Sequence, residues 1–491
     1  MAITLFVCVW VKKVQFGQTV PRLYPLRLFI QGNYAMARLT LAQQLTASLV
    51  EQIGNGTYRV GDRLPSLREC MRLFGHSKNT VINAYESLAS QGLVEARHGQ
   101  GFFVKQGALS SSEPEEPLPF TRAMDTIWLM RQQFVREPGH SPLGEGFPPV
   151  EWLMDLRLDK FTRQIMRMGV TTLFRYGNRL GNAALRQHLV QKLATYSITA
   201  SPRQIVTTHG ANHALDLIIR RFIAHGDYVL VEDPGYYPLF GKLQLQGARM
   251  LSVPRLPDGP DMEVLEQYLL LHKPKLFFMQ SVGHNPTGSD ISPGKAHRLV
   301  QLAQEHNFIL VDDDALADFK PASAIKVSAL DQLQRSLYVG SFSKSVSAAL
   351  RVGFIAGSKD VIDELGDLKM LLHTSTSELC ERTVDVILLE GHFLRHLIRL
   401  QERLKSATTA GLQVLDEIGA EVFVRPEQSL YLWARFPHID DARELTRRLL
   451  PKGFMIAPGH IFSPEQSRIN PWTRLNVAYL NDPLLKAVLS G

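Results

Sequence analysis

Apolar residues near the start of the chain recur every four positions. Leu45, Leu49 and Ile53 follow this spacing after Leu41, as the buried face of an amphipathic helix does. The two glycines that follow Ile53 interrupt the pattern, and glycine is typical of helix ends. The sequence therefore predicts a first helix that begins at Leu41 and ends at these glycines.

Two serines predict the starts of two further helices. Ser66 is followed three residues later by Glu69, which is the spacing of a capping box, and this helix stops at Gly75. Ser77 caps the next helix. The buried stripe of that helix is Val81, Tyr85 and Leu88. Two helices joined by so short a turn are typical of a helix-turn-helix motif.

A hairpin follows these helices. Residues 93–97 and 102–104 are predicted strands, and two glycines within residues 98–101 permit the positive φ of a tight turn. Three helices and a hairpin predict a winged helix-turn-helix, an α+β fold, over residues 36–105. The second motif helix of this fold enters the major groove of DNA with its first turn. Polar side chains of suitable length on the two motif helices are Arg68, Ser77, Lys78, Asn79, Thr80 and Asn83.

The same run resembles the GntR family of bacterial repressors. It carries G-D-x-L-P-S-x-R-E at residues 61–69 and S-x-x-T-V at residues 77–81. The resemblance implies contacts with double-stranded DNA from the motif helices and from the loop of the hairpin. The residues implied are Arg68, Lys78, Thr80 and Asn83, with His98, Gly99 and Gln100 in the loop. A winged helix that serves only protein contacts is the alternative.

The distribution of charge agrees with a nucleic-acid partner. The whole chain of 491 residues has a net charge of +7. Residues 1–105 hold twelve Lys and Arg against five Asp and Glu, which accounts for all of this excess. Positive charge confined to one region is expected where a protein meets phosphates. A solvated basic face without a partner is the alternative.

Residues 1–35 show neither helical nor strand periodicity. Their apolar start precedes Lys12 and Lys13, whereas a secretory signal places its charge first. We hypothesise that translation starts at Met36 and that residues 1–35 are a non-native or disordered extension.

Cysteine usage and hydropathy indicate the compartment. Cys8, Cys70 and Cys380 have no C-x-x-C spacing, which favours a reducing cytoplasm and disfavours a disulfide or metal site. No apolar run reaches the roughly 18 residues of a membrane span. We therefore expect a cytoplasmic protein without a membrane partner.

Residues 106–141 are predicted to link two domains. Residues 106–120 combine serine, proline and glutamate with few apolar side chains, as flexible linkers do. Residues 121–136 regain apolar side chains and are predicted to include a helix before the second domain, residues 142–491, begins.

The second domain alternates helices with short β-branched runs. This pattern predicts a mostly parallel sheet covered by helices on both faces, an α/β fold that binds ligands at the carboxyl ends of its strands. Predicted helices include residues 264–271 and 295–306. The predicted strands are residues 204–208, 228–231, 275–279, 308–311 and 336–339.

Polar residues follow most of these strands. Lys344 lies after the last predicted strand, and Asp313 lies just past the strand before it. The other candidates are Tyr236, Asn285, Gly210, Ala211, Asn212, Ser341, Ser343 and Arg351. Pyridoxal 5'-phosphate needs such a set: a lysine for an imine, a carboxylate for the ring nitrogen, a stacking ring, an amide donor for the ring oxygen, and amides, hydroxyls and an arginine for the phosphate. Each residue alone is more often structural, but six in this order make coincidence improbable.

The N-P-T-G run at residues 285–288 and the S-F-S-K-x6-R run at residues 341–351 resemble the fold-type I, class I/II aminotransferases. The resemblance extends from about residue 144 to the end of the chain. It implies that Lys344 carries the cofactor, that Asp313 pairs with the ring nitrogen, that Asn285 bonds the ring oxygen and that Tyr236 stacks on the ring. It also implies that Arg474 binds a substrate or effector carboxylate, and that Tyr176 reaches the phosphate of the neighbouring subunit in a homodimer.

Two positions depart from the aminotransferase pattern. Leu316 stands three residues after Asp313, where these enzymes usually have a tyrosine that donates to the ring oxygen. Gln428 and Ser429 replace a usual glycine pair. We therefore expect the ring oxygen to rely mainly on Asn285, and we expect transamination to be slow or absent while cofactor binding persists.

The order of the two domains resembles the MocR subfamily of GntR regulators over residues 36–491. This resemblance implies a dimeric transcription regulator whose aminotransferase-like domain binds pyridoxal 5'-phosphate and an amino compound as effector. One alternative is a working aminotransferase with an appended DNA-binding domain. Another is a regulator that has lost the cofactor, which the presence of Lys344, Asp313 and Arg351 disfavours.

Overall fold

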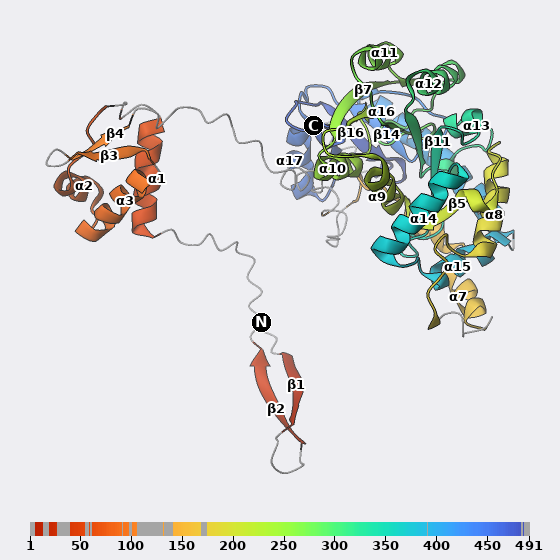
Figure 1. Ribbon diagram of the computed structural model, residues 1–491, viewed down its shortest axis with the longest axis horizontal. Helices are drawn as coiled ribbons and strands as arrows, with labels where there is room; N and C mark the ends of the chain where they lie inside the picture. The colour runs from red at the N-terminus through yellow and green to blue at the C-terminus, as the bar shows by residue number, and fades with distance from the viewer. Residues whose placement is uncertain are drawn as a thin grey trace. The chain divides into compact units, whose positions relative to one another are not determined.

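The computed structural model describes residues 5–12, 19–26, 40–54, 58, 61–90, 92–97, 101–105, 131, 141–167, 174–389, 391–482 and 485. The chain divides into two compact units, Met1–Glu116 and Pro117–Gly491 (Figure 1). The predicted linker lies outside the described residues except for Arg131 and Ser141.

The first unit contains the three predicted helices and the hairpin (orange in Figure 1). Its helices are α1 (Leu41–Gly54), α2 (Leu67–Phe74) and α3 (Lys78–Ser90). Its hairpin pairs β3 (Val94–Arg97) with β4 (Gly101–Val104) in antiparallel register. One buried cluster holds these elements together, and its members include Leu45, Leu49, Ile53, Val81, Tyr85, Leu88, Val94 and Val104. The predicted winged helix-turn-helix is therefore confirmed.

The capping box predicted at α2 is also confirmed. The Ser66 hydroxyl accepts a hydrogen bond from the Glu69 backbone N–H, and a Glu69 carboxylate oxygen accepts one from the Ser66 backbone N–H at 2.8 Å. Gly75 ends the helix at φ +68°, a left-handed conformation that glycine adopts without strain. The two ends of α2 are thus fixed by residues next to it in sequence.

Within residues 1–35 the structure describes two paired strands, although the sequence shows no strand periodicity there. β1 (Leu5–Lys12) pairs antiparallel with β2 (Thr19–Leu26), from Leu5 opposite Leu26 to Lys12 opposite Thr19. Valine, threonine and aromatic residues favour strands even where apolar and polar positions do not alternate. The start at Met36 stays a prediction.

The second unit is built on a mixed sheet of eight strands, in the order β5-β12-β11-β10-β9-β6-β7-β8. The neighbours from β11 to β7 are parallel, whereas β12 runs antiparallel to both β11 and β5. The strands are β5 (Ile205–Thr208), β6 (Tyr228–Asp233), β7 (Arg249–Leu256), β8 (Gly259–Pro260), β9 (Leu276–Met279), β10 (Ile309–Asp314), β11 (Ser336–Ser341) and β12 (Gly353–Ala356).

Helices cover both faces of this sheet, as predicted (Figure 1). Val229 and Val231 of β6 pack on one face with side chains from α9, α10 and α14, and Leu230 packs on the other with α11 and α12. This alternation follows from the two-residue period of a strand. These helices are α9 (Ala211–Phe222), α10 (Tyr237–Gln246), α14 (Lys359–His373), α11 (Met262–Leu271) and α12 (Pro293–His306).

A smaller sheet lies in the C-terminal part of the same unit, with the order β13-β14-β16-β15 and antiparallel pairing throughout. Its strands are β13 (Glu421–Val422), β14 (Tyr431–Arg435), β16 (Trp472–Asn476) and β15 (Ala457–Pro458). The remaining helices are α6 (Val150–Met154), α7 (Leu158–Arg167), α8 (Ala183–Thr195), α13 (Val327–Asp331), α15 (Glu378–Leu389), α16 (His392–Glu417) and α17 (Ala442–Leu449). Among the described helices, none has the length and apolar character needed to cross a membrane.

Candidate functional site

Five candidate residues of the second unit lie at the same edge of the large sheet. Asp313 is the last residue but one of strand β10, and Lys344 follows β11. Tyr236 follows β6, Asn285 follows β9, and Gly210 lies between β5 and α9. The five strands run in the same direction, so their carboxyl ends meet at this edge, where α/β sheets bind ligands.

Asp313 is a buried carboxylate with one unsatisfied oxygen. Its Oδ2 accepts a hydrogen bond of 3.3 Å from Gln280 Nε2, and its Oδ1 has no hydrogen-bond partner among the described residues. Burial raises the pKa of Asp313 to about 7, and the positive charge of Lys344 opposes this effect. A buried acceptor without a donor costs free energy, so this oxygen is suited to a cationic donor such as a pyridinium nitrogen.

Gln280 is a site residue that the sequence reasoning missed. Its Oε1 accepts a hydrogen bond of 2.7 Å from the Asn285 backbone, so one amide connects Asn285 with Asp313. Its own backbone N–H donates to Glu232 Oε2 at 2.9 Å. Gln280 directly follows β9, and this position at a strand end was the signal that could have identified it.

A buried ion pair between Arg255 and Glu232 holds the backbone of Gln280. Arg255 NH1 lies 2.6 Å from Glu232 Oε1 and donates to the Gln280 carbonyl at 3.0 Å. Burial alone would raise the pKa of Glu232, but Arg255 and His284 lower it to about 2. Glu232 is therefore charged at neutral pH and remains a fixed acceptor for the Gln280 backbone.

Arg351 and Gly210 form an anion cradle at the other end of the site. Arg351 NH1 donates to Ser343 Oγ at 3.2 Å, and its NH2 donates to the His209 carbonyl at 3.0 Å. A Cβ on Gly210 would lie 2.7 Å from Arg351 NH2 and would displace this guanidinium, and the φ of +77° also favours glycine here. The Ser343 backbone N–H donates to Ser341 Oγ at 3.2 Å, which orders the turn that carries Lys344.

The start of α9 completes the cradle. Gly210 is its N-cap residue, with φ +77°, and Ala211 is the first residue of the helix. Free backbone N–H groups and the helix dipole favour an anion at this end. Asn212 Oδ1 is buried without a hydrogen-bond partner among the described residues. The N–H groups and the dipole at this helix start fit a phosphate group, whereas the Asn212 oxygen is an acceptor and would need a donor.

Arg474 is almost fully buried, at 1% exposed, and is held on several sides. Its NH1 donates to Asn285 Oδ1 at 2.8 Å, which leaves the Asn285 amide nitrogen free of this contact. Its guanidinium carbon lies 4.7 Å from the centroid of the Tyr431 ring and 5.0 Å from that of Phe462. Arg474 Nε is buried without a hydrogen-bond partner in the described part of the chain. A buried guanidinium with an unused donor is suited to a carboxylate.

The small sheet also holds the backbone of residues 144–147. Arg474 NH2 donates to the Gly144 carbonyl at 2.7 Å, and the Tyr431 hydroxyl donates to the Gly146 carbonyl at 2.8 Å. Asn476 Nδ2 donates to the carbonyls of Glu145 and Phe147 at 3.1 and 2.7 Å. Side chains of β14 and β16 therefore fix this segment next to the site.

Tyr431 is a second residue that the sequence reasoning did not assign to the site. Its hydroxyl oxygen lies 3.1 Å from Lys344 Nζ and accepts a hydrogen bond from it. Leu316, which replaces the usual tyrosine, is buried in the same apolar cluster as Tyr431. The structure thus brings a phenol to Lys344 from β14 rather than from the segment after β10.

The two other predicted tyrosines differ in their surroundings. Tyr236 is half-buried, and burial raises the pKa of its hydroxyl above the ordinary value. Tyr176 is 85% exposed, and Phe174 beside it is 82% exposed. Within this chain, the structure therefore does not bring Tyr176 into the site. The homodimer contact stays a prediction.

Most of the DNA-binding candidates on the two motif helices of the first unit are exposed. Arg68, Ser77, Lys78, Asn79 and Asn83 are exposed, and Thr80 is half-buried with its hydroxyl 2.9 Å from that of Ser77. The Tyr85 hydroxyl donates to the Pro65 carbonyl at 2.7 Å and so fixes α3 against the turn before α2. His98, Gly99 and Gln100 lie outside the described residues.

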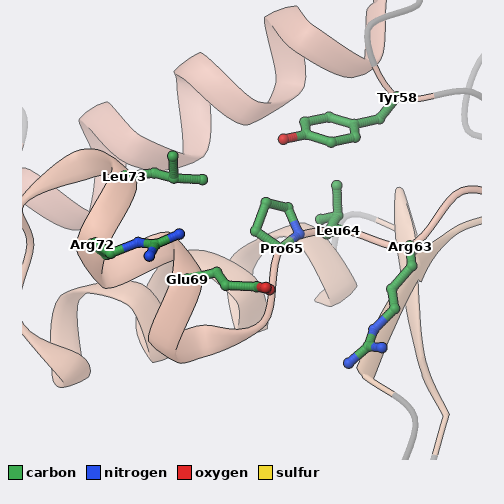
Figure 2. Close-up of a pocket in the computed structure, with 7 residues that line it drawn as sticks. All are labelled: Tyr58, Arg63, Leu64, Pro65, Glu69, Arg72 and Leu73. Atoms are coloured by element: carbon green, nitrogen blue, oxygen red, sulfur yellow. The ribbon is translucent and has the colours of Figure 1, made fainter.

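A shallow pocket of about 310 Å³ lies beside α2 in the same unit. Figure 2 shows its lining residues Tyr58, Arg63, Leu64, Pro65, Glu69, Arg72 and Leu73. Hydrogen bonds from Ser66 lower the pKa of Glu69, so the carboxylate at this pocket is ionised at neutral pH. Its charge balances one of the two arginines, and none of the predicted DNA contacts lines it.

The comparisons with known proteins agree with both units. Residues 142–491 match the family Aminotransferase class I and II, and residues 41–104 match Bacterial regulatory proteins, gntR family. The uncharacterized HTH-type transcriptional regulator YdcR of Escherichia coli (strain K12) is 32% identical over 442 residues, covering 88% of this chain and 93% of that protein.

Two solved aminotransferases share the fold of the second unit. Pyrococcus horikoshii kynurenine aminotransferase, in complex with PMP, is 25% identical with a TM-score of 0.68, covering 74% of this chain and 92% of that chain. The α-aminoadipate aminotransferase LysN from Thermus thermophilus is 26% identical with a TM-score of 0.67, covering 75% and 94%. It was solved with N-(5'-phosphopyridoxyl)-L-leucine.

The two folds define a protein in which a GntR-type winged helix precedes a fold-type I aminotransferase domain. This chain belongs to the class I and II aminotransferase family and, through its GntR-type domain, to the transcription regulators of the MocR type.

Proposed function

We propose that this transcription regulator binds pyridoxal 5'-phosphate on Lys344 and senses an amino compound there. The observation that carries the proposal is the buried, unpaired Asp313 Oδ1 at the strand end next to the one that leads to Lys344. Most buried carboxylate oxygens have a donor, and a pyridoxal site needs this oxygen for the ring nitrogen.

The remaining groups support the same cofactor. Arg351, Ser343 and the start of α9 fit its phosphate, and Asn285 has an amide nitrogen available for its ring oxygen. When bound, pyridoxal phosphate supplies a carbonyl that reacts with amines and a ring that withdraws electrons. The protein contributes the lysine that holds it and the carboxylate that keeps the ring nitrogen protonated.

Arg474 supports an effector that carries a carboxylate. Its unpaired Nε faces no acceptor among the described residues, and a guanidinium binds a carboxylate through two parallel donors. The solved LysN relative holds a pyridoxyl group joined to an amino acid, L-leucine. The proposed effector of this chain is therefore an amino acid or a similar amino carboxylate.

The proposed assembly is a cytoplasmic homodimer on double-stranded DNA. The exposed ring of Tyr176 supports the dimer, because an aromatic side chain with 85% of its surface exposed is suited to contact with a second copy. DNA contacts are proposed for Arg68, for Ser77 to Thr80 and for Asn83, which lie on α2 and at the start of α3. Contacts from the hairpin loop at His98, Gly99 and Gln100 belong to the same proposal.

DNA binding by the purified full-length protein tests this function. Its affinity for its own upstream region would be measured with and without pyridoxal phosphate and candidate amino acids, for the wild type and Lys344→Ala. We expect a visible absorbance band from the lysine-bound cofactor in the wild type, its loss in Lys344→Ala, and an affinity for DNA that responds to one amino acid only in the wild type.

The same samples separate the sensor from the enzyme. With an amino acid and a keto-acid acceptor, we expect a spectral change without sustained production of keto acid. Turnover near the roughly 10 per second typical of enzymes would favour the aminotransferase alternative. A wild type that shows no band when cofactor is supplied would contradict the proposal.

A further inference from the structure

Tyr431 is the protein group in hydrogen-bond contact with Lys344 Nζ in the described structure. The lysine nitrogen donates to the phenol oxygen at 3.1 Å. The phenol proton points elsewhere, because Tyr431 donates it to the buried Gly146 carbonyl at 2.8 Å. Tyr431 therefore faces the lysine as an acceptor.

The surroundings of Tyr431 leave its ring little freedom. The side chain is fully buried, and the Arg474 guanidinium stacks on its ring with 4.7 Å between the guanidinium carbon and the ring centroid. The titratable groups that face Lys344 are Tyr431 from β14 and Asp313 from β10. The cation of Arg474 lies beyond the Tyr431 ring, and that of Arg351 follows Lys344 on the same turn.

Ser429 fixes the backbone of Tyr431 from two residues away. Its hydroxyl donates to the Tyr431 carbonyl at 2.8 Å and accepts from the Tyr431 N–H at 3.2 Å. Its own N–H donates to the Thr408 hydroxyl at 3.1 Å. Gln428 Nε2 donates to the Phe319 carbonyl at 2.5 Å, three residues after Leu316. The pair that replaces two glycines thus connects β14 with the segment that lacks the tyrosine.

We infer that Tyr431 is a positioning residue for Lys344, and that Ser429 holds Tyr431 in place for this task. Because the Tyr431 proton is donated to Gly146, Tyr431 does not take over the hydrogen bond to the ring oxygen that is lost at Leu316. The two departures from the aminotransferase pattern lie next to each other in the fold: Leu316 shares a buried cluster with Tyr431, and Gln428 and Ser429 hold the strand that carries Tyr431. The inference rests on the proposed binding of pyridoxal phosphate to Lys344.

The test is a pH titration of the visible band in the full-length protein loaded with pyridoxal phosphate. Wild type would be compared with Tyr431→Phe, Ser429→Gly and the control Tyr228→Phe, which removes a phenol from the opposite end of β6. A phenol oxygen that accepts from the lysine nitrogen favours the protonated form of that nitrogen. We expect Tyr431→Phe to lose the band at a pH about one unit lower, because one hydrogen bond to a charged group is lost.

Ser429→Gly should move the midpoint in the same direction by a smaller amount, and Tyr228→Phe should leave it unchanged. The cofactor dissociation constant, measured in parallel, reports structural damage: weaker binding with an unmoved midpoint would mean that Tyr431 is only part of the core. An unmoved midpoint, or one that moves to higher pH, overturns the inference while the band itself upholds the proposed function. A wild type without a band would overturn the proposed function first.

Discussion

Asp313 is a residue whose surroundings suit ligand binding and reduce the stability of the fold. Its carboxylate is buried, one oxygen has no donor among the described residues, and burial raises its pKa to about 7. A group like this costs stability until a ligand supplies the missing donor.

The sign of the pH dependence follows from this shift. Because the folded pKa of Asp313 lies above the unfolded value, the folded state binds more protons between about pH 4 and pH 7, and its contribution to stability falls as pH rises through that range. Asp313→Asn removes the charge and the dependence together. We expect the cofactor-free variant to gain on the order of 2 kcal/mol relative to wild type at about pH 8, and much less at about pH 5.

Chemical denaturation of both proteins at the two pH values measures this difference. The exposed Asp440→Asn is the control and should show no such pH-dependent gain. In the presence of pyridoxal phosphate the order should reverse, because Asp313→Asn also removes the partner of the ring nitrogen. An equal effect at both pH values would contradict the assigned burial of the charge.

At the scale of elements, α2 depends on its cap. Ser66 and Glu69 satisfy two backbone donors at its first turn. Because the helix has only eight residues, the loss of these two hydrogen bonds is a large share of its backbone hydrogen bonding. We expect Ser66→Ala to destabilise the DNA-binding unit by about 1 kcal/mol and Ser66→Asp to restore most of it. The thermal unfolding of the full-length variants measures this. Ser90→Ala, at the exposed end of α3, should lie within about 0.5 kcal/mol of the wild type.

Local patterns predicted the elements whose ends and buried faces are set by neighbouring residues. The capping box at Ser66, the stripe of α3 and five strands of the large sheet were of this kind. β7, β12 and the two-residue strand β8 were missed. β7 mixes exposed and buried positions around Pro254, and β12 is a four-residue strand that begins with glycine. Their place depends on partners far away in sequence, such as β5 for β12.

The same distinction applies to the site. Lys344, Asp313, Asn285 and Arg474 stand in recognisable runs and could be proposed from sequence. For Gln280 the sequence offers only its position at a strand end, and for Tyr431 it offers no signal, because their contacts with Asp313 and Lys344 join residues 33 and 87 positions apart. The expectation that the ring oxygen relies mainly on Asn285 stays a prediction. The structure adds the phenol of Tyr431 next to Lys344, which the sequence spacing did not indicate.

At the scale of the whole molecule, the excess positive charge belongs to residues 1–105. If α2 and the start of α3 meet the phosphates, Arg68→Ala and Lys78→Ala should each weaken DNA binding and reduce the slope of log affinity against log salt by roughly one per lost contact. Titrations at several salt concentrations measure the slope. Arg249→Ala, which removes the same charge from β7, should leave it unchanged. Equal slopes for all three variants would contradict the assignment of Arg68 and Lys78 as phosphate contacts.

The hydrogen bonds to residues 144–147 connect the start of the second domain with side chains of the candidate site. Just before this segment, Ser141 pairs with Phe454, and the side chains that donate to residues 144–147 are Arg474, Tyr431 and Asn476. A change in the contacts of Arg474 or Tyr431 would therefore act directly on the backbone of residues 144–147. The start of the second domain and the side chains proposed to hold the effector thus belong to one network of hydrogen bonds.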